Sequence, residues 1–161
     1  MRVLSVDPGY GRCGLAVLEK QGGKERLLYS TCVETTPDKE FPERLAEIVY
    51  AFEEIVRKYT PDALALEKLF VTKNQKTAMH VAEVRGALIS AAAKAGMLVF
   101  EYTPSQVKSA STGNGRADKQ AVVKMLHALV TIRDDIRHDD EYDAIAVGIT
   151  HLARTRSATS R

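Results

Sequence analysis

The chain begins with three strand-like segments in direct succession, after which helix-like and strand-like segments alternate. The first three segments cover residues 2–7, 13–19 and 26–35 and are rich in apolar and β-branched side chains. Short turns between successive strands favour antiparallel pairing, whereas strands connected through a helix pair in parallel. This order predicts an α/β protein with a mixed five-stranded sheet, an antiparallel N-terminal meander and helices on both faces.

The later elements are predicted from the spacing of apolar residues. A period of 3.6 residues indicates a helix, and a short apolar run indicates a buried parallel strand. The glycines of the turn GYGR, residues 9–12, are expected to connect the first two strands because glycine tolerates positive φ. We expect strands over 62–67 and 97–102 and helices over 42–59, 77–95, 104–110, 117–130 and 142–154.

Composition and charge indicate a soluble domain but identify no partner. The formal charge of +2 is small, and no apolar run approaches the length of a membrane-spanning helix. Cys13 and Cys32 lie in strand-like runs without metal-ligand spacing and are expected to be reduced. We expect a cytoplasmic protein, not bound to membranes, with one domain over residues 1–155 and a basic, disordered tail over residues 156–161.

Two of the predicted strands end in a carboxylate. Asp7 is followed at once by Pro8 and Gly9, and Glu67 ends the strand over residues 62–67. Each acid alone is adequately explained by a turn or a surface loop, since Asp is a good turn former. In an α/β sheet, however, ligands bind beyond the carboxyl ends of the parallel strands, so the two acids are placed to meet.

A third element supplies two more acids. Asp140 and Asp143 are three residues apart and share one face at the start of the last predicted helix. Helix capping and the helix dipole explain one of them. They do not explain why Asp143 directly precedes the apolar residues 144–147, because a buried carboxylate must be paired or must bind a metal.

Four carboxylates from three elements favour hard divalent cations. Mg²⁺ prefers oxygen ligands, with Mn²⁺ as a possible substitute, and two such ions about 4 Å apart activate water and stabilise the leaving oxygen of a phosphodiester. Nearby lysines, at Lys68, Lys108 and Lys119, could neutralise phosphates. Hydrolysis of nucleic acid is therefore the simplest interpretation of the residues.

The motifs, taken in order from the N-terminus to about Arg154, resemble the RuvC family of Holliday junction resolvases. A bare DPG motif would be weak, but the combination is highly specific. The resemblance is carried by DPG at Asp7, CGLAV, LEKLF around Glu67, KNQKTAM, VRGALI, FEYTPSQVK ending at Lys108, GNGRADKQAV and DEYDAIAVGITH.

The resemblance implies a fold and an activity. It implies a ribonuclease-H-like fold, a homodimer, and paired nicks in two strands of like polarity at a four-way DNA junction. It also implies dependence on Mg²⁺, some preference for cleavage sequence, and cooperation with the RuvA–RuvB branch-migration complex. The family's catalytic, metal-binding acids match Asp7, Glu67, Asp140 and Asp143.

Further site residues follow from the same resemblance. Lys108 and Lys119 match lysines with catalytic or DNA-contact roles, and Phe70 matches an aromatic residue that stacks on junction bases. Some relatives have histidine at the third metal ligand, so His138 or Asp139 could replace Asp140 there. The DNA-binding set that we predict is Phe70, Lys73, Lys76, Lys108, Arg116 and Lys119.

Three other functions share features with this sequence. A ribonuclease-H-like RNA-processing nuclease would use the same acids, although the full set of motifs argues against it. A sugar-kinase-like or actin-like ATPase also begins with a strand, an acid and a glycine turn, but needs a second domain for which 161 residues leave no room. A junction-binding protein without activity would have no need of all four acids.

Overall fold

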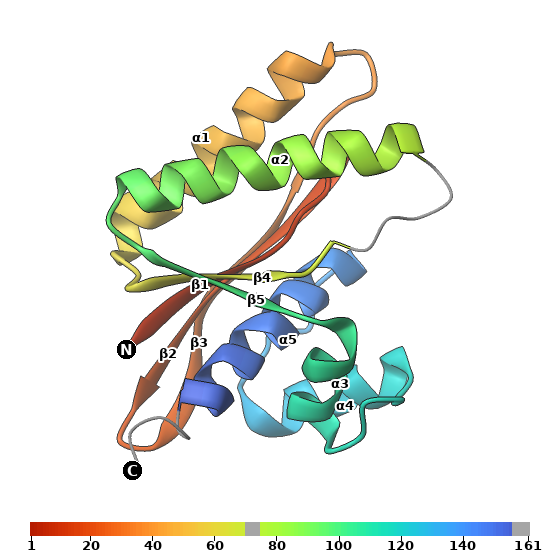
Figure 1. The fold of residues 1–161 in the computed structure, drawn as a ribbon. Helices are drawn as coiled ribbons and strands as arrows, with labels where there is room; N and C mark the ends of the chain where they lie inside the picture. The colour runs from red at the N-terminus through yellow and green to blue at the C-terminus, as the bar shows by residue number, and fades with distance from the viewer. Residues whose placement is uncertain (70–74, 156–161) are drawn as a thin grey trace.

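Residues 1–69 and 75–155 are described by a computed structural model, and within them five strands form one mixed sheet in the order β3-β2-β1-β4-β5 (Figure 1). β1 pairs antiparallel with β2 and parallel with β4, which confirms the predicted meander and crossovers. The elements are β1 (Arg2–Asp7), β2 (Arg12–Gln21), β3 (Lys24–Glu34), α1 (Phe41–Tyr59), β4 (Ala63–Glu67), α2 (Gln75–Lys94), β5 (Leu98–Tyr102), α3 (Pro104–Thr112), α4 (Lys119–Leu129) and α5 (Asp139–Arg154).

Helices cover both faces of the sheet. α1 and α2 lie on one face, and α3, α4 and α5 lie on the other (Figure 1). Side chains of β1 alternate between the two cores: Leu4 and Val6 pack on the side of α1 and α2, whereas Val3 packs with α5. Among the helices of the described residues, none combines the length and the apolar composition that crossing a bilayer needs.

The turn between β1 and β2 has a different physical basis from the one predicted. Gly9 and Gly11 do not have positive φ; in the described chain, the glycines that do are Gly22, Gly23, Gly96 and Gly113. Gly9 is required for space, because a Cβ there would lie 2.2 Å from the carbonyl oxygen of Arg12. The prediction of a short turn is confirmed, and the reason given for its glycines is wrong.

Two small residues of α2, Ala82 and Gly86, face away from the rest of the chain. Ala82 and Gly86 are exposed, Ala78 is half-buried, and a Cβ on Gly86 would meet nothing within 4 Å. The buried side of the same helix carries Val84 and Leu88. Internal helix packing therefore does not account for Ala82 and Gly86.

Candidate functional site

Strand alternation places Asp7 and Glu67 on the face of the sheet that α5 covers. Ser5 lies on that face, against α5, and Asp7 follows it two residues later in β1. In β4, Ala65 packs into the core that contains α5, and Glu67 again follows two residues later. Because Val6 pairs with Leu66, the two acids occupy the next position in neighbouring parallel strands.

Two glycines let α5 approach this face closely. Gly14 pairs with Asp7 across β1 and β2, and a Cβ on Gly14 would lie 1.9 Å from the carbonyl oxygen of Asp140. Farther along the helix, a Cβ on Gly148 would lie 2.2 Å from Cδ1 of Leu18. The first turn of α5 therefore rests on β2 beside Asp7, which brings Asp140 to the ends of the strands.

The four acids interact electrostatically. Burial, followed by the negative charges of Asp143, Asp140 and Glu67, raises the pKa of Asp7 to about 7, although Lys119 opposes the rise. Burial and Asp143 also raise the pKa of Glu67 above its ordinary value, against the opposing charge of Lys108. Mutual repulsion of this kind is expected of carboxylates that share a site for cations.

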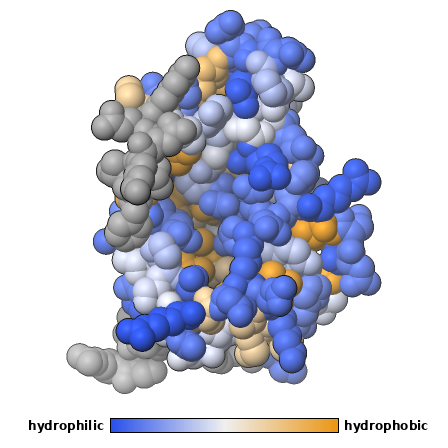
Figure 2. Space-filling view, turned by 90° about the vertical axis from the view of Figure 1, so that its right-hand side faces the viewer, coloured by the Kyte–Doolittle hydropathy of each residue, from blue (hydrophilic) through white to orange (hydrophobic). Residues whose placement is uncertain are grey.

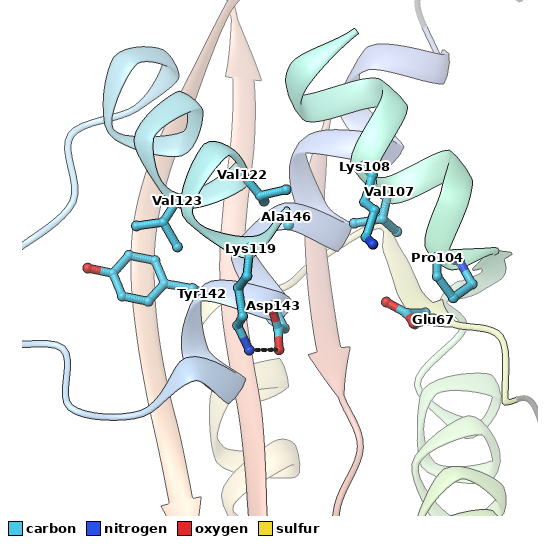
Figure 3. Close-up of a pocket in the computed structure, with 10 residues that line it drawn as sticks. All are labelled: Glu67, Pro104, Val107, Lys108, Lys119, Val122, Val123, Tyr142, Asp143 and Ala146. Carbon is cyan, nitrogen blue, oxygen red and sulfur yellow. Dashed lines mark hydrogen bonds and ion pairs between the residues drawn. The ribbon is translucent and has the colours of Figure 1, made fainter. Parts of the chain in front are cut away.

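Two cationic side chains partly neutralise these acids. Nζ of Lys119 lies 3.0 Å from Oδ2 of Asp143 (Figure 3). The same nitrogen lies 3.2 Å from Oδ2 of Asp139. Partial burial, the largest single influence, disfavours the ammonium ion, but the hydrogen bonds and negative charges of Asp143 and Asp139 together outweigh it and raise the pKa of Lys119. On the other side, Nε of Arg12 lies 3.2 Å from Oδ2 of Asp140.

The donor atoms suit a divalent ion, although the side chains are not arranged around one. Within residues 1–69 and 75–155, no three acidic, histidine or cysteine side chains are grouped as metal ligands would be. The buried Oδ2 of Asp140 nevertheless accepts no hydrogen bond, because Arg12 is out of line for one. An oxygen-rich, mutually repelling set with an unused buried acceptor fits a hard cation after side-chain movement.

A pocket of 270 Å³ opens beside Asp143. Glu67 and Lys108 lie on one side of it, and Lys119 and Asp143 lie on the other (Figure 3). Thr103 and Gln106 form a reciprocal capping box that fixes the start of α3 and thereby the position of Lys108. The remaining lining is mostly apolar and consists of Pro104, Val107, Val122, Val123, Tyr142 and Ala146.

The neighbours of Asp140 are less suited to the acidic site. The side chain of Asp139 is 75% exposed and pairs with Lys119. The side chain of Asp140 is only 22% exposed. Burial is the main cause of the raised pKa of Asp7, and the charge of Asp140 adds to it. Both ring nitrogens of His138 have other partners: Nε2 lies 2.8 Å from Oε1 of Glu34, and Nδ1 lies 3.3 Å from Nη1 of Arg12. The geometry therefore favours Asp140 over His138 and Asp139 as the third acid.

The predicted DNA-contact residues are only partly described. Phe70 and Lys73 lie outside the described residues, and the side chain of Lys76 does too. Arg116 is exposed in the loop before α4, where its backbone N–H donates to Oδ1 of Asn114. The side of the molecule on which β4 ends and α2 begins, on the right in Figure 1, is predominantly hydrophilic (Figure 2).

Three residues of the site were not predicted from the sequence. Arg12 neutralises Asp140, Gly14 admits α5, and Nη1 of Arg85 donates to the carbonyl oxygen of Glu67 at 2.7 Å. Arg85 also pairs with Glu101 and so ties the end of β4 to α2 and β5. Only Arg12 had a signal in the sequence: it lies directly after the turn that follows Asp7, which places it close to the acids.

Replacing Asp7 with Asn should stabilise the metal-free protein at neutral pH. The pKa of Asp7, raised by burial to about 7, lies above that of an ordinary Asp, so folding carries an ionisation penalty that is absent near pH 4 and complete above pH 7. Asn carries no such penalty. In chelator at pH 8 we expect a gain on the order of 2 kcal/mol, which disappears near pH 4.

Urea unfolding at both pH values measures this difference. Mg²⁺ should then stabilise the wild-type protein more than the Asn variant, because the ion relieves a repulsion that the variant lacks. Equal stabilities of the two metal-free proteins at pH 8 would show that the acids do not repel one another.

Known proteins match this chain over nearly its whole length. The family model for crossover junction endodeoxyribonuclease RuvC matches residues 3–151. The protein of that name from Brachyspira hyodysenteriae is 39% identical over 97% of this chain and 96% of its own length. The one from Halothermothrix orenii is 42% identical over 94% of this chain and 92% of its own length. The structure of T. thermophilus RuvC in complex with Holliday junction substrate is 34% identical, with a TM-score of 0.92 over 99% of this chain and 97% of that one.

Proposed function

The chain belongs to the RuvC family of crossover junction endodeoxyribonucleases, and we propose that it resolves four-way DNA junctions by paired, metal-dependent nicks in two strands of like polarity. It has the ribonuclease-H-like fold that was predicted. The activity serves DNA recombination and repair. One observation best supports an active site at this position: carboxylates from β1, β4 and α5 lie close enough to interact. Their charges add to the effect of burial, which raises the pKa of Asp7 to about 7.

We assign the metal site to Asp7, Glu67, Asp140 and Asp143. Nucleases of this family depend on metal ions, and we propose Mg²⁺, replaceable by Mn²⁺, with two ions per subunit. When bound, such ions activate a water molecule and stabilise the leaving oxygen of the phosphodiester. The protein contributes the oxygen ligands and the buried surroundings that strengthen their interaction with a cation.

Lys119 and Lys108 are placed to act on the phosphate. Lys119 is in the first turn of α4, where the helix dipole disfavours a cation, so its position depends on Asp143 and Asp139. With cations held by these acids, the Lys119 ammonium would be available to the phosphate and to the developing charge on the leaving oxygen. Lys108 lines the same pocket beside Glu67.

Binding of the junction involves a larger surface and a second subunit. We propose that Lys108, Arg116 and Lys119 contact DNA phosphates, together with Lys73 and Lys76, and that Phe70 stacks on an unpaired base. A homodimer would present two active sites to the two related phosphates of a junction. The exposed Ala82 and Gly86 of α2 offer a surface for close packing of the two subunits. RuvA–RuvB is the proposed partner complex.

Incubation of the purified protein with a mobile synthetic junction and Mg²⁺ tests this function. We expect symmetric nicks in two strands of like polarity whose ends can be ligated, and no product in chelator. Linear duplex of the same sequence is the control, and a structured RNA tests the alternative of an RNA-processing nuclease. Random cuts, flap-directed cuts or faster cleavage of the RNA would contradict the proposal.

A further inference from the structure

A second depression adjoins the acidic site from the opposite face of the sheet. Its volume is 610 Å³, and Asp140 forms part of its wall. The pocket that contains Lys108 and Lys119 is built by β4, α3, α4 and α5, whereas this groove is built mainly by the β1–β2 turn, the end of β3, α1 and α2. The two depressions therefore lie at the same end of the sheet, on either side of the acids.

Arg44 of α1 is held in a fixed position in this groove. Its Nε donates to Oγ1 of Thr35 at 2.8 Å, and its guanidinium carbon lies 4.8 Å from the centre of the Tyr10 ring. Thr35 is itself fixed, since its hydroxyl donates to the carbonyl oxygen of Tyr10. A guanidinium anchored through Nε and stacked on an aromatic ring loses little further entropy when it binds an anion.

The two terminal nitrogens of Arg44 have no partner within the described residues. Neither nitrogen forms a hydrogen bond or an ion pair there, although Nη1 and Nη2 together carry four N–H donors. Nη2 lies against Gly11, where an added Cβ would be only 3.3 Å away, so the glycine leaves this edge of the guanidinium open. By contrast, the other charged groups of the groove are paired: Arg12 with Asp140, and Glu34 with His138.

The geometry points to a second phosphate site: we propose that Arg44 binds a backbone phosphate of the junction strand whose scissile phosphate lies at the acids. This inference rests on the proposed function, which supplies the DNA. A strand that crosses the acids must continue on both sides of them. Lys108 and Lys119 lie on one side, and Arg44, which has no ion pair within the described residues, lies in the groove on the other. Cations at Asp140 would also release Arg12 toward the same strand.

The test measures junction affinity without divalent ions across a range of salt concentrations. Arg44→Gln should lower the affinity for the junction about tenfold. It should also make the slope of log K against log salt concentration shallower, by the amount that corresponds to the loss of about one phosphate contact. Arg44→Lys should keep the slope but recover only part of the affinity, because it keeps the charge and loses the bidentate geometry. Arg57→Gln is the matched control on the same helix, since Arg57 is 66% exposed and pairs with Glu54 away from the groove.

A purely structural role of Arg44 predicts a different result. Thr35→Val removes the anchor of the turn but keeps the charge of Arg44, so a structural role requires this variant to reproduce the affinity loss of Arg44→Gln. A wild-type slope and affinity for Arg44→Gln, or equal losses for the two variants, would overturn the inference. Failure of the wild-type protein to bind the junction would instead contradict the proposed function.

Discussion

Replacing Asp7 with Asn is expected to lower the rate of junction nicking by about a thousandfold or more while changing junction affinity by less than about twofold. Burial, aided by the charges of Asp143, Asp140 and Glu67, raises the pKa of Asp7 to about 7. An amide at this position removes a charged ligand from the proposed ion site. The cations that we propose to contact phosphates, at Lys108, Lys119 and Arg44, are left in place.

Single-turnover cleavage with saturating Mg²⁺ and binding in chelator measure the two effects separately. Asp38→Asn is the matched control, because Asp38 is exposed and precedes α1. Unfolding cannot explain the loss if the Asp7 variant is, as we expect, more stable than the wild type in the metal-free state. Cleavage by the Asn variant at the wild-type rate would rule out the assignment of Asp7 and, with it, the proposed ion site.

The sheet could be predicted from the sequence because its causes are local. Runs of apolar and β-branched residues joined by short turns determine the meander, and apolar runs separated by helices determine the parallel half. The placement of Asp7 and Glu67 at one edge follows from the same rules. The prediction erred at the start of α5, which begins at Asp139 rather than residue 142, because Asp139 and Asp140 are themselves favourable in a first turn.

The ion pairs of the site could not be predicted, because they depend on how distant elements pack. Lys119 reaches Asp143 from another helix, and Arg12 reaches Asp140 from another part of the chain. Such contacts are set by side-chain rotamers at the ends of elements, and the sequence shows at most, as for Arg12, that a residue lies near the site. The same holds for Arg44, whose position depends on Thr35 and Tyr10 from two other segments.

The position of the acids also depends on a feature that carries no charge. Gly14 is flanked in β2 by Cys13 and Leu15, whose side chains pack in the core on the side of α1 and α2. On the opposite face, the missing side chain of Gly14 leaves room for the backbone of α5. A strand glycine ordinarily weakens a sheet, so its presence directly opposite Asp7 calls for a packing reason. Its position next to the carbonyl oxygen of Asp140 supplies that reason.

Gly14→Ala should therefore disrupt the site without altering any charged residue. A Cβ only 1.9 Å from the carbonyl oxygen of Asp140 collides with backbone, so the first turn of α5 has to move away from β2. We expect a loss of about 3 kcal/mol in stability and, well below the unfolding temperature, a drop in cleavage of about a hundredfold, since a displacement near 1 Å suffices for this. Junction binding in chelator should change little.

Gly148→Ala is the matched comparison within the same helix–sheet contact. Its Cβ would meet Cδ1 of Leu18 at 2.2 Å and Oγ of Ser5 at 2.7 Å, which are side-chain atoms that can turn away. Stability should fall by about 2 kcal/mol, while cleavage by the folded protein stays within a few-fold of wild type. Equal losses of cleavage in the two variants would mean that general loosening of α5, rather than the contact between Gly14 and Asp140, controls the acids.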